Sequence, residues 1–145
     1  MRAAIWQGPG TMTVGTVPEP VCPRDGVLLR VTATGICGTD VRVFFNGDRR
    51  IEAPWVLGHE ICGEVLEIGP DAHDAQHVAV GDAVHCISTL YCGRCRLCRS
   101  GNEHICLHYQ LMGFDFPGAY AEYVAIPEIA CKGLFKIPDG LSAAH

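Results

Sequence analysis

Residues 92–106 read Cys-Gly-Arg-Cys-Arg-Leu-Cys-Arg-Ser-Gly-Asn-Glu-His-Ile-Cys, and the rest of the chain is best understood from this stretch. Its four thiols, Cys92, Cys95, Cys98 and Cys106, lie within fifteen residues, so that one short loop can direct them toward a common point. Four thiolates arranged in this way are typical of a tetrahedral, structural zinc site. The arginines between the cysteines offset the negative charge of such a centre. The sequence therefore predicts a zinc lobe at about residues 88–110.

Other cysteine chemistries fit this stretch less well. The chain has nine cysteines, an odd number, and it begins in strand-like sequence without a signal peptide, which argues against a secreted disulfide framework. A redox Cys-x-x-Cys pair is expected between a strand and a helix, and this one is not. An iron–sulfur cluster is a stronger alternative, but the bacterial ferredoxin motif requires a further Cys-Pro pair that is missing here. Zinc is favoured and iron–sulfur stays open.

Length and composition indicate one small, β-rich domain. The chain has 145 residues, of which 48% are hydrophobic, and its 17 glycines and 9 prolines favour short strands over long helices. We therefore expect a fold that is mainly β with short helices, of the β or α+β class. The net charge of −5 argues against nucleic acid or an anionic membrane as a partner, and no apolar run is long enough to span a membrane. We expect a cytoplasmic protein.

Local patterns predict several elements in the first third of the chain. Residues 2–7 and 11–17 are expected to form a hairpin around Gly8-Pro9-Gly10, and residues 27–33 to form a strongly β-prone strand. A helix of one or two turns is expected over residues 41–46. Its apolar side chains Phe44 and Phe45, and later Trp55, are interpreted as core residues or as pocket wall.

A glycine-flanked cysteine follows the predicted strand, in Thr34-Gly-Ile-Cys-Gly-Thr-Asp40. Taken alone, Cys37 is more often a small buried apolar residue than a ligand. Its neighbours favour a site, because Thr39 offers a hydroxyl for proton transfer and Asp40 offers an acceptor that can orient a metal-binding group. Cys37 is therefore a candidate ligand.

A histidine and a glutamate interrupt the apolar sequence that follows Pro54. A lone histidine in such a place is usually a hydrogen-bonded structural residue. Together with Cys37, however, His59 is a candidate second ligand, since imidazole and thiolate are both good zinc donors. Cys62 is interpreted as a packed strand residue.

These motifs occur together, and in order, in one enzyme family. They are the Thr34–Asp40 motif, Gly58-His-Glu-x-x-Gly63 followed by Gly69 and Ala72, the four-cysteine stretch, and Gly118-Ala-Tyr-Ala-Glu-Tyr-Val-Ala-Ile-Pro127. With them the chain resembles the zinc-dependent medium-chain alcohol dehydrogenases, and within these the polyol and threonine dehydrogenases. The resemblance implies a GroES-like catalytic domain over residues 1–145, a partly closed β-barrel from which the zinc lobe protrudes.

The resemblance also implies roles for individual residues. Cys37 and His59 would bind a catalytic zinc, and Glu60 would sit beside the metal, coordinating it directly or from behind a ligand. Thr39 would hand on the substrate proton, and Asp40 would hold the His59 imidazole in the right tautomer. The metal would act as a Lewis acid for the transfer of hydride from a secondary alcohol to NAD or NADP. The four lobe cysteines would bind a second, structural zinc.

Two features depart from this family pattern. Many relatives carry a histidine three positions after Thr39 as the last member of a proton relay, and Arg42 stands there instead. Arginine cannot accept a proton at ordinary pH, so Arg42 is interpreted either as a contact for a cofactor phosphate or a polar substrate, or as a solvated helix residue. In addition, Ser142-Ala-Ala144 reads as a helix start, but no Gly-x-Gly-x-x-Gly follows a strand, so a Rossmann domain is absent from this chain.

The resulting hypothesis is an isolated catalytic domain that holds the lobe zinc, binds metal weakly at Cys37 and His59, and is inactive by itself. The substrate would be a small alcohol or polyol, and surface left uncovered in the isolated domain favours self-association into a homo-oligomer. The alternative is a non-enzymatic, zinc-stabilised GroES-like binding or assembly module.

Overall fold

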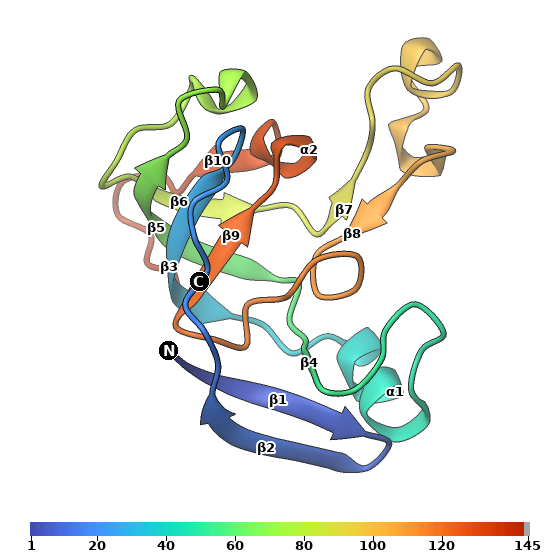
Figure 1. Cartoon of the computed structure of the whole chain (residues 1–145). Coiled ribbons are helices and arrows are strands. Elements are labelled where there is room, and N and C mark those ends of the chain that lie inside the picture. The colour runs from blue at the N-terminus through green and yellow to red at the C-terminus, as the bar shows by residue number, and fades with distance from the viewer. Residues whose placement is uncertain (144–145) are drawn as a thin grey trace.

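The computed structural model describes residues 1–143 and shows three antiparallel sheets with two short helices (Figure 1). The predicted fold class, mainly β with short helices, is confirmed. The strands are β1 (Arg2–Gly8), β2 (Thr11–Thr16), β3 (Val27–Thr34), β4 (Trp55–Val56), β5 (Ile61–Ile68), β6 (Ala83–Cys86), β7 (Thr89–Leu90), β8 (Gln110–Leu111), β9 (Tyr123–Ile126) and β10 (Leu134–Lys136). The helices are α1 (Gly38–Asn46) and α2 (Glu128–Cys131), with 3-10 turns η1 (His73–Ala75), η2 (Cys98–Ser100) and η3 (Glu103–Ile105).

The largest sheet has five strands in the order β10-β6-β5-β3-β9. Its central pair, β3 and β5, runs antiparallel from Val27↔Ile68 to Thr34↔Ile61. The end of β3 therefore lies beside the start of β5. As a result, the loop that leaves β3 and the loop that enters β5 emerge together at one edge of the sheet.

Alternating burial along the central strands builds the main core. In β5, Ile61 and Val65 are fully buried while the residues between them are half-buried or are glycine, which is the period of two expected for a strand with one face inward. Val27 and Leu29 of β3 and Val84 of β6 meet them on the same face. This core fixes the register on which the loops at the sheet edge depend.

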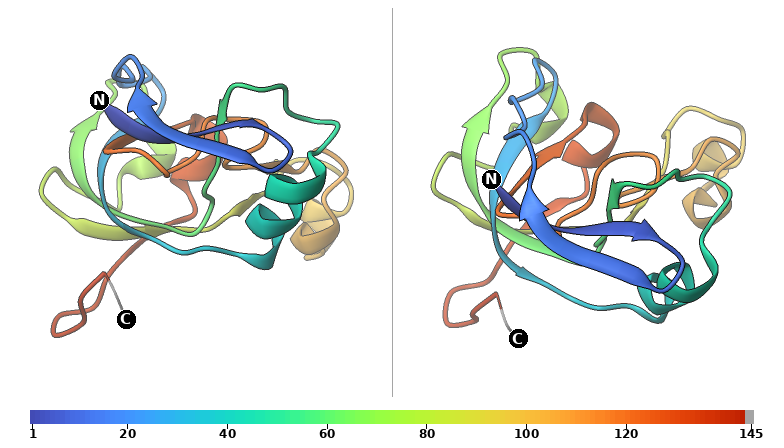
Figure 2. Two further views of the ribbon diagram at one scale, coloured as in Figure 1. Left: turned by 90° about the horizontal axis from the view of Figure 1, so that it is seen from below. Right: turned by 60° about the horizontal axis from the view of Figure 1, so that its bottom comes forward.

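A second, smaller core joins the β1–β2 hairpin to helix α1. It consists of Trp6, Val43, Ile51, Leu57 and Phe114, with Phe44, Trp55, Leu111 and Tyr120 packed against it. The backbone N–H of Gly10 donates to the carbonyl of Phe44 at 2.7 Å, which fastens the hairpin turn to the helix. Figure 2 shows α1 beside the turn that connects the two strands of this hairpin.

Helix α1 begins at Gly38, three residues before its predicted start at residue 41. The physical reason is the Asp40 side chain, which accepts a hydrogen bond from the backbone N–H of Cys37 at 2.9 Å and so satisfies a donor that precedes the helix. Phe44 packs on the second core, as expected, whereas Phe45 is 62% exposed and is not a core residue.

The four-cysteine segment projects from the sheets as a separate lobe (Figure 1). It lies between β7 and β8, which pair at its base through Thr89↔Leu111 and Leu90↔Gln110. At the other end of the chain, the helix start expected at residues 142–144 reaches Ala144, which lies outside the described residues. Across residues 1–143, no helix combines the length and the apolar character needed to cross a lipid bilayer.

Candidate metal centres

Cys37, His59 and Glu60 come together at the edge of the large sheet. One potential ligand atom from each of them lies within 4.8 Å of the others. Cys37 follows β3 and caps α1, whereas His59 and Glu60 precede β5. The antiparallel register of β3 and β5 is therefore what joins two motifs that are 22 positions apart in the sequence.

Gly35 lets the two loops approach each other. Its backbone N–H donates to the carbonyl of Glu60 at 3.0 Å, which extends the β3–β5 pairing by one more link. A side chain at position 35 would collide with the side chain of Glu60. Glycine at this position therefore lets the exposed Glu60 carboxylate lie on the side of Cys37 and His59, because a larger residue would make this flexible side chain turn away.

Asp40 supports both candidate ligands from behind. Its side chain is only 4% exposed, and its Oδ2 accepts the N–H of Cys37 while its Oδ1 lies 3.4 Å from Nδ1 of His59. That separation is long for a hydrogen bond, and within residues 1–143 the two buried atoms have no closer polar partner. The Asp40 carboxylate thus faces Nδ1 of the imidazole at the outer limit of hydrogen-bonding distance.

The ionisation of this group follows from the same contacts. Hydrogen bonding to Asp40, with a further contribution from Cys37, raises the pKa of His59 to about 9 despite its burial. Burial opposes ionisation of Asp40, but its contacts with His59 and with the Cys37 N–H outweigh this and lower its pKa. Hydrogen bonds from the backbone and hydroxyl of Thr39, followed by the contact with His59, lower the pKa of Cys37.

The donor set of this group fits a divalent zinc ion. A thiol with a lowered pKa, an imidazole and a carboxylate are all zinc ligands, and a carboxylate at the far nitrogen of the imidazole is a frequent companion of zinc-bound histidine. Because the structure brings three donors together, at least one position of a tetrahedral ion would remain for water, substrate or a further donor.

The four lobe cysteines form a second cluster. Their sulfur atoms are separated by 3.5 Å for Cys95–Cys98 and Cys92–Cys106, and by 4.0 Å for Cys92–Cys98 and Cys95–Cys106. Four sulfurs about 2.3 Å from a central ion at tetrahedral angles lie about 3.8 Å apart, so the cluster has the dimensions of a zinc site. All nine cysteines of the chain are free, which excludes a disulfide framework for this structure.

Backbone N–H groups point at the lobe sulfurs. Cys95 N–H donates to Sγ of Cys92 at 3.4 Å, Cys98 N–H to Sγ of Cys95 at 3.5 Å, and His108 N–H to Sγ of Cys106 at 3.3 Å. Donors arranged in this way stabilise thiolate over thiol, the form that binds metal. The local turns of residues 92–108 thus prepare a four-cysteine metal site.

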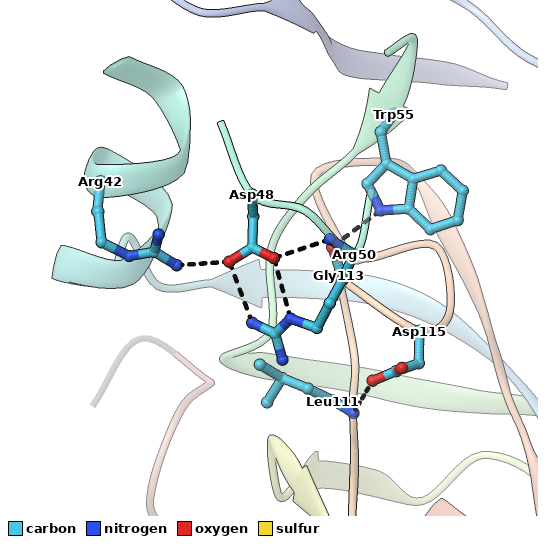
Figure 3. A network of polar contacts seen from close by, with 7 residues as sticks. All are labelled: Arg42, Asp48, Arg50, Trp55, Leu111, Gly113 and Asp115. Atoms are coloured by element: carbon cyan, nitrogen blue, oxygen red, sulfur yellow. Dashed lines mark hydrogen bonds and ion pairs between the residues drawn. The ribbon is translucent and has the colours of Figure 1, made fainter. Parts of the chain in front are cut away.

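A polar network joins Arg42 of α1 to the turn that follows this helix (Figure 3). Asp48 accepts from Arg42 at 2.8 Å and from both the backbone N–H and the Nε of Arg50 at 3.0 Å. The Arg50 guanidinium then lies over the Phe114 ring, 4.3 Å from its centroid, and this ring lies 6.2 Å from the imidazole of His59. Arg42 is thus paired with Asp48 in this structure.

Two further hydrogen bonds lie beside this network (Figure 3). The indole Nε1 of Trp55 donates to the carbonyl of Gly113 at 2.8 Å, and the N–H of Leu111 donates to Asp115 at 2.8 Å. The first bond connects the segment before His59 with the segment that carries Phe114, and the second stabilises the turn of that latter segment.

Sequence reasoning missed several of the residues around the site. Asp48 and Arg50 stand in a charged turn at the end of α1, which reads as an ordinary solvated loop. Phe114 and Tyr120 come from a distant part of the chain, and no spacing in the sequence connects them to His59. Gly118, two residues before Tyr120, was the available signal. Its lack of a side chain permits the close approach of this backbone to that of Leu57 and Gly58.

A comparison with protein families identifies this architecture. Residues 23–139 match the model of the alcohol dehydrogenase GroES-like domain. The chain belongs to this family. The predicted resemblance to zinc-dependent medium-chain dehydrogenases is confirmed, and it applies to their N-terminal, GroES-like domain.

Individual relatives of this GroES-like domain are dehydrogenases. The L-threonine 3-dehydrogenase of Caldanaerobacter subterraneus subsp. tengcongensis is 46% identical over 112 residues, which cover 75% of this chain and 31% of that protein. Galactitol-1-phosphate dehydrogenase from Escherichia coli superposes with a TM-score of 0.83 at 28% identity, covering 98% of this chain and 39% of that one. A zinc-binding dehydrogenase from Sinorhizobium meliloti 1021, bound to NADP, gives a TM-score of 0.81 at 34% identity, with 97% and 39% covered.

This chain thus spans about a third of the length of the curated relatives that it matches. The share is 31% for the L-threonine 3-dehydrogenase of Caldanaerobacter and 36% for that of Salmonella gallinarum. The prediction that it falls in an oxidoreductase family whose members use zinc and a nicotinamide cofactor is confirmed at the level of these relatives.

Proposed function

We propose that this chain is the catalytic, substrate- and zinc-binding domain of a zinc-dependent alcohol dehydrogenase that transfers hydride from a secondary alcohol to NAD or NADP. The observation that carries the proposal is the convergence of Cys37, His59 and Glu60 within 4.8 Å, with the buried carboxylate of Asp40 behind the imidazole. A structural role alone does not account for a thiol, an imidazole and a carboxylate directed at one point.

In this proposal, Cys37 and His59 hold the catalytic zinc, with Glu60 beside it, and the lobe cysteines Cys92, Cys95, Cys98 and Cys106 hold a structural zinc. The catalytic ion supplies Lewis acidity that lowers the pKa of a bound alcohol. Asp40 keeps the imidazole oriented through Nδ1, so that the other ring nitrogen is available. The domain comprises residues 1–145, with the lobe at about residues 88–110.

The reaction requires one proton and one hydride to leave the substrate in different directions. In this proposal, the hydroxyl of Thr39, which hydrogen-bonds the Cys37 thiol, takes up the alcohol proton and passes its own proton on. The hydrogen on the carbinol carbon leaves with its electron pair for the nicotinamide ring, so that the alcohol becomes a ketone and NAD(P)⁺ becomes NAD(P)H. Arg42, paired with Asp48, provides a cation near α1 that is suited to a cofactor phosphate or a polar substrate.

The relatives support the substrate class. L-threonine carries a secondary hydroxyl group and galactitol 1-phosphate carries several, which favours a small polyol or hydroxylated amino acid as substrate. The nine free cysteines favour a reducing compartment, and we therefore place the protein in the cytoplasm. Homo-oligomerisation is part of the proposal as well, since exposed apolar side chains such as Val14 and Ile36 remain uncovered in this chain.

Metal content per chain tests the proposal. We expect about two zinc ions in wild type after loading, about one in Cys37→Ser and about one in Cys95→Ser, because each variant loses a donor of one cluster. Cys62→Ser is the matched control, since Cys62 is a half-buried cysteine of β5 outside both clusters. If Cys37→Ser retains as much zinc as wild type, the catalytic assignment fails, and iron in place of zinc would overturn both assignments.

A further inference from the structure

Tyr120 lies between the two loops that carry the candidate ligands. Its backbone N–H donates to the carbonyl of Leu57 at 2.9 Å, and the adjacent Ala119 N–H donates to the carbonyl of Gly58 at 2.9 Å. These two bonds pair residues 119–120 with the segment immediately before His59. The backbone of Tyr120 is therefore fixed to the His59 loop.

The side chain of Tyr120 reaches the other loop. Its hydroxyl donates to the carbonyl of Gly35 at 3.2 Å, across 85 positions of the sequence, and it lies beside the Asp40 carboxylate. Burial, followed by the negative charge of Asp40, raises the pKa of Tyr120. The hydroxyl thus stays protonated and remains a donor at neutral pH. Gly35 and Asp40 flank Cys37 on both sides.

The ring of Tyr120 packs where Gly58 has no side chain. Gly58 has a φ of +98°, and a Cβ at this position would lie 2.7 Å from Cδ1 of the ring. Glycine at position 58 therefore allows both the left-handed backbone and the close packing of the ring. The aromatic body of Tyr120 rests on the His59 loop while its polar tip holds the Cys37 loop.

We propose that Tyr120 is a positioning residue that holds the Cys37 loop and the His59 loop in a fixed relation, so that their donor atoms meet. This inference rests on the proposed function, because it assigns Tyr120 a role toward the metal that Cys37 and His59 would bind. It goes beyond that function in naming a residue outside the three donors Cys37, His59 and Glu60. Its hydroxyl is the part that matters, since a phenylalanine ring would keep the packing on Gly58.

The variant Tyr120→Phe tests the role of the hydroxyl through metal affinity. Chains whose lobe is loaded with zinc are titrated with cobalt in competition with a chelator, and the thiolate-to-cobalt absorption band is followed. We expect 10- to 100-fold weaker cobalt binding and a changed band in Tyr120→Phe, the range found when a residue that supports a metal ligand is lost. Tyr123→Phe, which removes the hydroxyl of a half-buried tyrosine of β9, is the control and should bind as wild type.

Amide hydrogen exchange provides a second readout that needs no metal. The N–H groups of Gly35 and Cys37 are bonded to Glu60 and Asp40, so their exchange in Tyr120→Phe should be about tenfold faster than in wild type. The N–H of Val65, bonded to Asp82 in the sheet, should be unchanged.

The outcomes separate the two proposals. A wild type that binds no cobalt beside the lobe zinc would overturn the proposed function, while the exchange of Gly35 and Cys37 would still decide the role of Tyr120. If Tyr120→Phe matches Tyr123→Phe in exchange at both amides, the positioning role is wrong. Faster exchange at Val65 as well as at Gly35 and Cys37 would also overturn the positioning role, because it would show that Tyr120 contributes to the stability of the whole fold.

Discussion

At the scale of single residues, Asp48 pairs with two arginines beside the candidate catalytic centre, and the three side chains together keep a net positive charge. Its side chain is 10% exposed, and hydrogen bonds from Arg50, with further bonds from Arg42, hold the pKa of Asp48 far below its usual range even though burial acts in the opposite direction. Arg50 in turn covers the ring of Phe114. The carboxylate thus anchors a chain of contacts that reaches the neighbourhood of His59.

Asp48→Asn should lower the free energy of unfolding at pH 7 by about 1–3 kcal/mol, because hydrogen bonds to a charged acceptor are lost. Since the folded pKa of Asp48 lies below its unfolded value of about 3.9, its contribution is complete above that value and is lost as the pH falls toward the folded pKa. Denaturant unfolding between pH 7 and pH 3 should therefore show a smaller acid-induced loss of stability in the variant than in wild type.

The control for this prediction is Asp71→Asn. Asp71 pairs with Arg24 at 2.9 Å, but the two side chains are 51% and 79% exposed, so that solvent screens the pair and the expected change is below about 1 kcal/mol. Equal stability of Asp48→Asn and wild type across the pH range would show that the network contributes nothing.

At the scale of elements, the segment before β9 is packed directly on the loop before β5. Gly118 is buried, its N–H donates to the carbonyl of Val56 at 2.8 Å, and a Cβ at position 118 would collide with the carbonyl oxygens of Leu57 and Gly58. Since these are backbone atoms, they cannot rotate away as a flexible side chain would. The contact places the two segments at a fixed separation.

Gly118→Ala should therefore destabilise the fold by about 1–3 kcal/mol, as overpacking usually does, and should also weaken metal binding at Cys37 and His59. Gly38→Ala is the matched control, because no atom lies within 4 Å of a Cβ at this first position of α1 and alanine favours a helix. Thermal unfolding of both variants, followed by cobalt titration, checks the prediction. A Gly118→Ala variant as stable as Gly38→Ala would contradict it.

The sequence predicted some helices and strands more accurately than others. The first three strands were placed within one residue, because β-prone runs and the Gly8-Pro9-Gly10 turn are strong local signals. The start of α1 was missed, since it depends on one side-chain bond from Cys37 to Asp40. The two-residue strands β4, β7 and β8 have no periodicity of their own and are defined by their partners.

At the scale of the whole molecule, the two metal clusters differed in how far the sequence could predict them. The four-cysteine cluster was predictable from spacing, because its donors are close in the chain. The grouping of Cys37, His59 and Glu60 depends on the β3–β5 register, which no local pattern determines. Cys37 and His59 were expected together from their donor chemistry, and Glu60 was added by the family resemblance. The approach of Asp48, Phe114 and Tyr120 was not predictable, since it follows from side-chain packing across three segments.

The chain by itself should not oxidise alcohols. Its relatives are about three times as long, and this sequence has no glycine-rich fingerprint after a strand to hold the nicotinamide cofactor. We expect no formation of NADH or NADPH from L-threonine or a polyol by the zinc-loaded chain beyond the rate of Cys37→Ser, measured by the absorbance of the reduced cofactor. Turnover above that of the variant would show that the cofactor is bound by residues of this chain.

The contact between Tyr120 and Gly35 has a consequence for the order in which the protein matures. The four lobe thiols are complete once residue 106 has been synthesised, and their turns are local, so the lobe can capture an ion while the chain is still growing. In the proposed arrangement, the other cluster depends on the contact that joins residues 35 and 120. A shortage of metal during synthesis would therefore first reduce the occupancy of the lobe site. The second ion would bind only after the protein has folded.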